Sequence, residues 1–152
     1  MTIRDSAILF IATGGWTGRS PKAPGTVGTL AGIPFVLVFS VIPAAFSGVY
    51  VTALVLAAVF VADQAEKLIG RKDPGCIVID EIAGYVITMS VVPVQISTLV
   101  AGFLIFRFFD IVKPAPVKYF ETRFTGGAAV VLDDVMAGVL SAFVLWVLCL
   151  WL

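Results

Sequence analysis

The charged side chains of this chain fall into three clusters that are separated by long neutral stretches. Together the clusters hold all 10 Lys and Arg residues and all 10 Asp and Glu residues; they lie within residues 4–22, 63–81 and 107–134. The neutral stretches cover residues 23–62, 82–106 and 135–152. Because a charge is costly in hydrocarbon and a neutral apolar helix is not, this pattern indicates a membrane protein.

Composition supports this interpretation and excludes other classes. Hydrophobic residues make up 60% of the chain and charged residues 13%, whereas soluble domains carry about 25% charged residues. The formal net charge is zero, so no basic field attracts nucleic acid. A length of 152 residues predicts a single domain over residues 1–152. No cleavable signal peptide is expected, because the apolar stretch at residues 6–13 is short.

The neutral stretches set the number of membrane crossings, since a spanning helix needs about 20 apolar residues. Residues 23–62 predict two helices with a turn at residues 43–48, and the terminal stretch predicts one. Residues 82–106 form either one helix interrupted by Pro93 or a hairpin that turns at residues 92–95. We favour the hairpin, because it returns every charged cluster to one side of the membrane.

The sequence therefore predicts an all-α fold, a polytopic membrane helical bundle with about five membrane segments. The positive-inside tendency places the face that carries every Lys and Arg, and with it the motif loops, in the cytoplasm. The prolines within residues 113–118 break the chain. We expect an interfacial helix after them over residues 117–124, anchored by Tyr119, Phe120 and Phe124.

Five carboxylates at the expected helix ends form the strongest functional signal. They are Asp80 and Glu81, which open one helix, Asp110, which closes the next, and Asp133 and Asp134, which open the last. Helices that converge at the cytoplasmic face would bring these groups together, where like charges oppose ionisation. A divalent cation removes that repulsion. Oxygen ligands in a chain without histidine favour Mg²⁺ or Mn²⁺ over zinc.

We expect four of these acids, Asp80, Asp110, Asp133 and Asp134, to hold the metal. Glu81 is then expected to be the general base or an orienting group. In the alternative interpretation, acids at helix N-termini only complement the helix dipole. That explanation does not suit Asp110, which needs a metal or one of the cations Arg107 and Lys113 as its partner.

Residues 23–30 lead into the first membrane helix and suit phosphate binding. Gly25 frees the backbone, Thr26 and Thr29 offer hydroxyls, and the helix start presents unpaired amides. The alternative is an ordinary Pro-Gly turn followed by a threonine N-cap. Arg107 and Lys113 are placed to neutralise a bound phosphate, or else to extend toward the interface.

Four motifs, in order along nearly the whole chain, are similar to those of the phosphatidylglycerophosphatase A family. They are Ala23-Pro-Gly-Thr-x-Gly-Thr29, Asp73-Pro-x-x-Ile-Val-x-Asp-Glu-x-x-Gly84, Phe106-Arg-x-Phe-Asp-Ile-x-Lys-Pro-x-Pro116 and Gly126-Gly-x5-Asp-Asp-x-x-Ala-Gly138. The resemblance implies a Mg²⁺-dependent phosphatase of the bacterial inner membrane. Its substrate would be the lipid phosphatidylglycerophosphate and its product phosphatidylglycerol.

The resemblance also implies site residues. It places catalysis on Asp80, Glu81, Asp110, Lys113, Asp133 and Asp134, with Thr26 and Arg107 as further contributors. It indicates nothing about oligomeric state.

Other mechanisms and classes lack their signatures. The chain has no histidine, no Arg six residues after Cys76 and no Asp-x-Asp pair, which excludes three covalent phosphatase routes. Attack by water remains, with Asp110 as an alternative nucleophile. A CDP-alcohol-type phosphotransferase would carry an Asp-Gly-x-x-Ala-Arg opening, which is absent. A divalent-cation transporter would place charge in the middle of a span, and a scaffold subunit would not need clustered acids.

Overall fold

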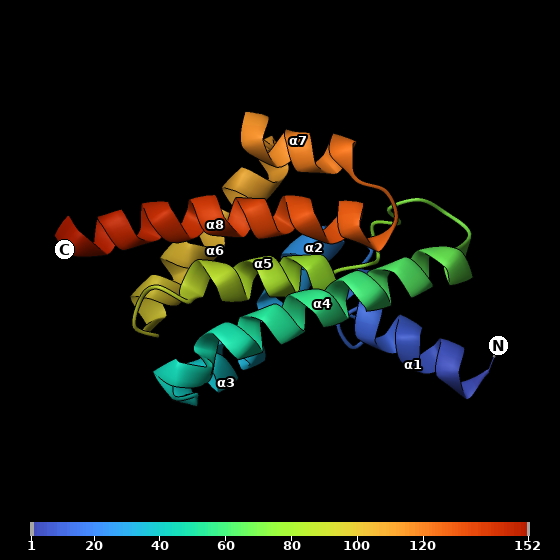
Figure 1. Cartoon of the computed structure of the whole chain (residues 1–152), viewed down its shortest axis with the longest axis horizontal. Helices are drawn as coiled ribbons and strands as arrows, with labels where there is room; N and C mark the ends of the chain where they lie inside the picture. Colours follow the sequence, from blue (N-terminus) through green and yellow to red (C-terminus); the bar gives the residue numbers. More distant parts are fainter. Residues whose placement is uncertain (1, 152) are drawn as a thin grey trace.

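The computed structural model describes residues 2–151, except for the side chains of residues 116 and 120–122. Its described part is helical throughout and contains no strand, so the all-α prediction is confirmed. Figure 1 shows the helices, which are α1 (Ile3–Ala12), the 3-10 helix η1 (Thr17–Arg19), α2 (Pro24–Ala31), α3 (Ile33–Val41), α4 (Ala44–Ile69), α5 (Ile79–Met89), α6 (Ile96–Val112), α7 (Ala115–Arg123) and α8 (Gly127–Trp151).

Three helical segments among the described residues are long and apolar enough to cross a membrane. They are Pro24–Val41, which combines α2 and α3, then α4, and then α8. The two helices predicted within residues 23–62 are therefore present. The predicted turn at residues 43–48 is wrong, because Pro43 takes an extended conformation as the N-cap and α4 starts at Ala44. The total of about five membrane segments stays a prediction.

Residues 82–106 fold as two helices, as the hairpin interpretation predicts. Helix α5 ends at Met89 and α6 begins at Ile96, with Pro93 in the turn between them. The Thr98 hydroxyl donates to the Pro93 carbonyl at 2.7 Å and fixes the start of α6. In Figure 1 this turn, the α3–α4 turn and the end of α8 lie at one end of the bundle. The starts of α5 and α8 lie toward the other end.

Helix α5 is the centre of the bundle. All its residues except Glu81 are buried, and α8, α4, α6, α2 and α3 pack around it. Its contact with α8 is close because Gly84 faces Gly138: a Cβ added to Gly138 would lie 2.5 Å from the Gly84 carbonyl oxygen. The Thr88 hydroxyl donates to the Gly84 carbonyl at 2.9 Å inside this contact. Two helices with small residues at their crossing can bring their backbones together in this way.

Two further helices lie outside the long spans. Helix α1 was not expected from the sequence; Thr2 and Asp5 form a capping box that starts it, and it packs on α4. Helix α7 lies where the interfacial helix was predicted; Tyr119 on the helix and Phe124 at its C-cap are exposed. The side chain of Phe120, the third predicted anchor, lies outside the described residues.

Candidate active site

The five predicted acids lie on α5 and on two helices that pack against it, α6 and α8. Asp80 and Glu81 lie in the first turn of α5, and Asp110 lies in the last turn of α6. Asp80, Asp110 and Asp133 are charged neighbours of the Asp134 carboxyl group, so residues far apart in the sequence meet at one place. The convergence that the sequence predicted is therefore present.

Asp133 and Asp134 do not open the last helix, and that prediction is wrong. Helix α8 begins at Gly127, so both acids lie about two turns inside it. The start of α8 packs closely on α4, because a Cβ at Gly127 would lie 2.2 Å from the Val59 carbonyl oxygen and 2.5 Å from the Asp63 nitrogen. Because the dipole effect falls off within the first turn, it does not explain these two acids.

The closest group in the cluster is Asp80, Glu81 and Asp134. Each offers one carboxylate oxygen, and these oxygens all lie within 4.8 Å of one another. Buried oxygens with no hydrogen-bond partner occur on each of the three, namely Asp80 Oδ1, Glu81 Oε2 and Asp134 Oδ2. Buried carboxylates without partners are strongly unfavourable. The geometry and the donor set therefore fit a hard divalent cation such as Mg²⁺.

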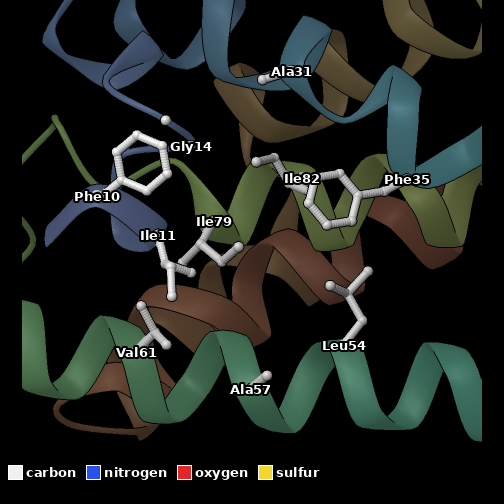
Figure 2. Close-up of a pocket in the computed structure, with 11 residues that line it drawn as sticks. Phe10, Ile11, Gly14, Ala31, Phe35, Leu54, Ala57, Val61, Ile79 and Ile82 are labelled. Atoms are coloured by element: carbon white, nitrogen blue, oxygen red, sulfur yellow. The ribbon is translucent and has the colours of Figure 1, made fainter. Parts of the chain in front are cut away.

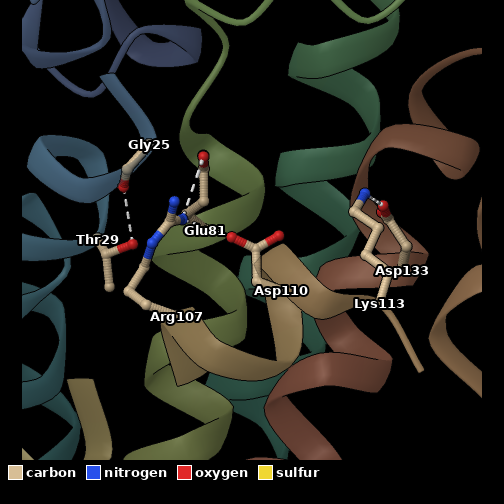
Figure 3. A network of polar contacts seen from close by, with 7 residues as sticks. All are labelled: Gly25, Thr29, Glu81, Arg107, Asp110, Lys113 and Asp133. Carbon is tan, nitrogen blue, oxygen red and sulfur yellow. Dashed lines mark hydrogen bonds and ion pairs between the residues drawn. The ribbon is translucent and has the colours of Figure 1, made fainter. Parts of the chain in front are cut away.

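Two cations border the acids. Arg107 donates to Asp110 at 2.5 Å, which supplies the partner predicted for this acid, and Arg107 also lies 3.8 Å from the nearer oxygen of Glu81. Lys113 forms an ion pair with Asp133. Figure 3 shows the Asp110 carboxylate between these two cations, both of which come from the end of α6. The five acids outnumber the two cations, so the cations pair with only part of the cluster.

The glycine segment that was expected to bind phosphate lies inside α2, which begins at Pro24. The alternative that a threonine is its N-cap is wrong, because the cap is Ala23 with a left-handed backbone. Thr29 is buried and its hydroxyl donates to the Gly25 carbonyl at 2.8 Å, within the helix (Figure 3). Thr26 lies half-buried in the first turn, where no side chain caps the helix.

Gly25 brings this helix start against the acidic cluster. A Cβ at Gly25 would overlap Glu81 Oε1 and would lie 3.1 Å from a guanidinium nitrogen of Arg107. With a side chain at this position, the Glu81 carboxylate would have to shift for the first turn of α2 to stay this close to the Glu81–Arg107 pair. The start of a helix presents N–H groups that favour an anion. The structure therefore places a helix N-terminus beside the acids.

Sequence reasoning missed Gly84 and Gly138 as residues of the site. Each lies four residues after an acid of the closest group, Gly84 after Asp80 and Gly138 after Asp134. Residues four apart share one face of a helix. The acid and the small residue on each helix therefore face the same neighbour. This repeated spacing was the available signal.

The chain is similar in sequence to known proteins of one family. The family model described as Phosphatidylglycerophosphatase A matches residues 10–149, which include every acid of the cluster. A protein of that name from Escherichia coli (strain K12) is 37% identical over 138 residues, covering 90% of this chain and 80% of the relative. The chain belongs to the phosphatidylglycerophosphatase A family. The family resemblance of the sequence motifs is confirmed.

Two other relatives extend the comparison. Phosphatidylglycerophosphatase A of Haemophilus influenzae is 31% identical over 147 residues, covering 95% of this chain and 90% of the relative. A Bacteroides thetaiotaomicron protein named as a candidate phosphatidylinositol-3-phosphatase is 37% identical over 153 residues, covering 94% and 93%. No solved structure matches the chain. Family membership supports a phosphatase over the transporter and phosphotransferase alternatives.

Proposed function

We propose that this member of the phosphatidylglycerophosphatase A family hydrolyses the phosphate monoester of phosphatidylglycerophosphate, giving phosphatidylglycerol and phosphate, with Mg²⁺ in the acidic cluster. One observation carries the mechanism: three carboxyl groups, each with a buried oxygen that has no hydrogen-bond partner, offer ligand oxygens within 4.8 Å of one another, beside two cations and a helix start. Two relatives are named as phosphatidylglycerophosphatases, which supports phosphatidylglycerophosphate as the substrate.

Asp80, Glu81 and Asp134 are the proposed ligands of the metal, with Asp110 and Asp133 close by. When bound, Mg²⁺ polarises the phosphoryl group and offsets the charge that develops on its oxygens. Glu81 thus moves from the base role expected from the sequence to a ligand role, because its oxygen belongs to the closest group. Its other partner, Arg107, holds the carboxylate in place from the side of α6.

The cations and the start of α2 hold the phosphate in this proposal. Arg107 and Lys113 neutralise its oxygens, and the backbone N–H groups and Thr26 hydroxyl in the first turn of α2 donate to it. Both cations are paired with acids in the structure, with Asp110 and Asp133 respectively. A phosphate dianion therefore competes for groups that are already placed and partly desolvated.

Asp133 is the proposed acceptor of the proton from water. Its Oδ1 is buried without a hydrogen-bond partner, while Lys113 pairs with Oδ2 and orients the carboxylate. Asp133 also lines a small cavity of about 70 Å³ together with Lys72 and Asp73 of the loop before α5. A polar cavity of this size holds water. In this proposal, water from this cavity attacks the phosphorus while the P–O bond to the glycerol breaks. Asp133 takes the proton of the water and returns a proton to the leaving glycerol oxygen.

The apolar spans and the position of the acids also bear on the membrane location and orientation of the protein. The family's bacterial relatives and the three apolar spans make this a membrane protein. We propose that the end of the bundle carrying the acids faces the cytoplasm at the bacterial inner membrane, because all Lys and Arg residues belong to that side. The acyl chains of the substrate then stay in the bilayer while the headgroup enters the polar site.

Phosphate release by the purified full chain in detergent tests the function. We expect release from phosphatidylglycerophosphate with Mg²⁺, loss of release with a chelator, and loss in Asp80→Asn. Phosphatidylinositol 3-phosphate is the comparison substrate, because one relative is named for it. Faster release from that lipid would reject the proposed substrate, and release that ignores the chelator would reject the metal.

A further inference from the structure

A second feature of the molecule is an apolar cavity of about 430 Å³ between α1, the α2–α3 segment, α4 and α5. Figure 2 shows side chains from all of these elements pointing into it. Every lining residue is hydrophobic or glycine; among them are Phe10, Ile11, Phe35, Ala57, Ile79 and Ile82. Cavities that hold small molecules measure about 300–1,000 Å³, so this one has room for a ligand.

Helix α5 separates this cavity from the acidic cluster. Ile79 and Ile82 line the cavity, and they lie three residues apart on one face of α5. Asp80 belongs to the group formed with Asp134 of α8. Successive residues of an α-helix are rotated by about 100°, so Asp80 lies on the face away from Ile82. The cavity is therefore distinct from the proposed catalytic centre.

The mouth of the cavity is continuous with the lipid-facing surface. Phe10 and Ile11 are each 48% exposed at the edge, and Ala57 is exposed on α4. On the same two spans Leu37 of α3 and Leu56 of α4 are exposed large apolar residues. In a bilayer these side chains contact hydrocarbon. The cavity opens into that surface between two candidate spans.

The contents of such a cavity follow from its chemistry. An apolar cavity without polar partners does not hold water and binds apolar molecules instead. The molecules that surround α3 and α4 in a membrane are phospholipids, whose acyl chains are flexible hydrocarbon. We infer that the acyl chain of a bilayer phospholipid other than the substrate occupies this cavity. The chain lies against Ile79 and Ile82 and supports α5 on the side away from Asp80.

Photolabelling of the full chain in vesicles tests this inference. The vesicles contain phosphatidylethanolamine, phosphatidylglycerol and a trace of phosphatidylcholine with a diazirine on its acyl chain. After irradiation, peptide mapping should show an excess of label on Phe10 and Ile11 over the open lipid-facing residue Leu56. In Ala57→Trp the label on Phe10 and Ile11 should fall at least about tenfold, because the indole excludes several CH₂ groups.

Two controls make the result specific. Ala53→Trp carries the same change one turn earlier on α4, outside the cavity lining, and should keep the label. If Ala57→Trp does not fold, Ala31→Leu narrows the cavity from α2 and decides the question in its place. Equal labelling of Phe10 and Ile11 in the cavity variant and in Ala53→Trp would overturn the inference. A wild-type protein that shows no more label on Phe10 and Ile11 than on Leu56 would overturn it as well.

A competition experiment distinguishes binding of this lipid from binding of the substrate. Excess phosphatidylglycerophosphate should leave the label on Phe10 and Ile11 unchanged. Competition by that lipid would make the cavity part of the substrate site and would overturn the assignment to another phospholipid. The labelling does not depend on catalysis, so its outcome stands apart from the phosphate-release assay.

Discussion

Replacing Gly138 with alanine perturbs the contact that sets the spacing of α5 and α8. The new Cβ would lie 2.5 Å from the Gly84 carbonyl oxygen and 3.1 Å from the Gly84 Cα atom. Both are backbone atoms, so no side chain can rotate away. Ordinary contact begins at 3.4 Å, and the helices must therefore separate by about 0.9 Å at this point.

That separation reaches the acidic cluster directly. Asp134 lies one turn before Gly138 on α8, and Asp80 lies one turn before Gly84 on α5. A displacement of about 1 Å in a catalytic arrangement lowers the rate roughly 100-fold. We expect phosphate release by Gly138→Ala to fall by about that factor. Overpacking of this kind also lowers the free energy of unfolding, by about 1–3 kcal/mol.

Two matched glycine variants serve as controls in the same assays, phosphate release and thermal unfolding in detergent. Gly48→Ala lies in α4 with nothing within 4 Å of the new Cβ, so activity should stay unchanged. Gly102→Ala meets the Met89 sulfur, the end of a flexible side chain, and should cost stability more than activity. If Gly138→Ala keeps wild-type activity, or if Gly48→Ala loses as much, the argument from helix spacing fails.

Three further predictions concern the site. Gly25→Ala should lower phosphate release at least about tenfold, since its Cβ overlaps Glu81 Oε1; unchanged kinetics would contradict the close approach of α2. Arg107→Lys should raise KM for the lipid, because lysine cannot replace the guanidinium contacts with Asp110 and Glu81; an unaltered KM would count against phosphate binding there. Asp133→Asn should abolish release but keep Mg²⁺ binding by calorimetry, whereas Asp80→Asn should lose both; equal Mg²⁺ affinities would refute these roles.

Several features of the fold were predictable from single stretches of sequence. The apolar spans follow from runs of neutral residues, and the α5–α6 turn follows from Pro93 between two short apolar arms. Helix α1 does not follow from the apolar pattern, because residues 6–13 are too short to span a membrane and the helix depends on its packing against α4. The start of α8 lies earlier than the apolar pattern predicts, at Gly127, which packs on Val59 and Asp63 of another helix.

The candidate site, too, was predictable only in part from the sequence. The sequence identified the five acids, Arg107 and Lys113, because charges at the edges of apolar stretches stand out. It did not predict that Glu81 would join Asp80 and Asp134 while Asp133 pairs with Lys113. Those pairings depend on the rotation of each helix about its own axis, which the positions of charges along the chain do not specify.

What the sequence determined by itself is the class of protein, its long apolar segments, its family and the candidate site residues. The cost of a charge in hydrocarbon applies to each residue separately, so its consequences follow from the order of residues along the chain. Only the tertiary structure decided which acids meet and how closely. Distances between helices depend on the sizes of the residues where they cross, here Gly84 against Gly138 and Gly25 against Glu81. Such contacts join residues far apart in the chain and exist only once the helices are packed.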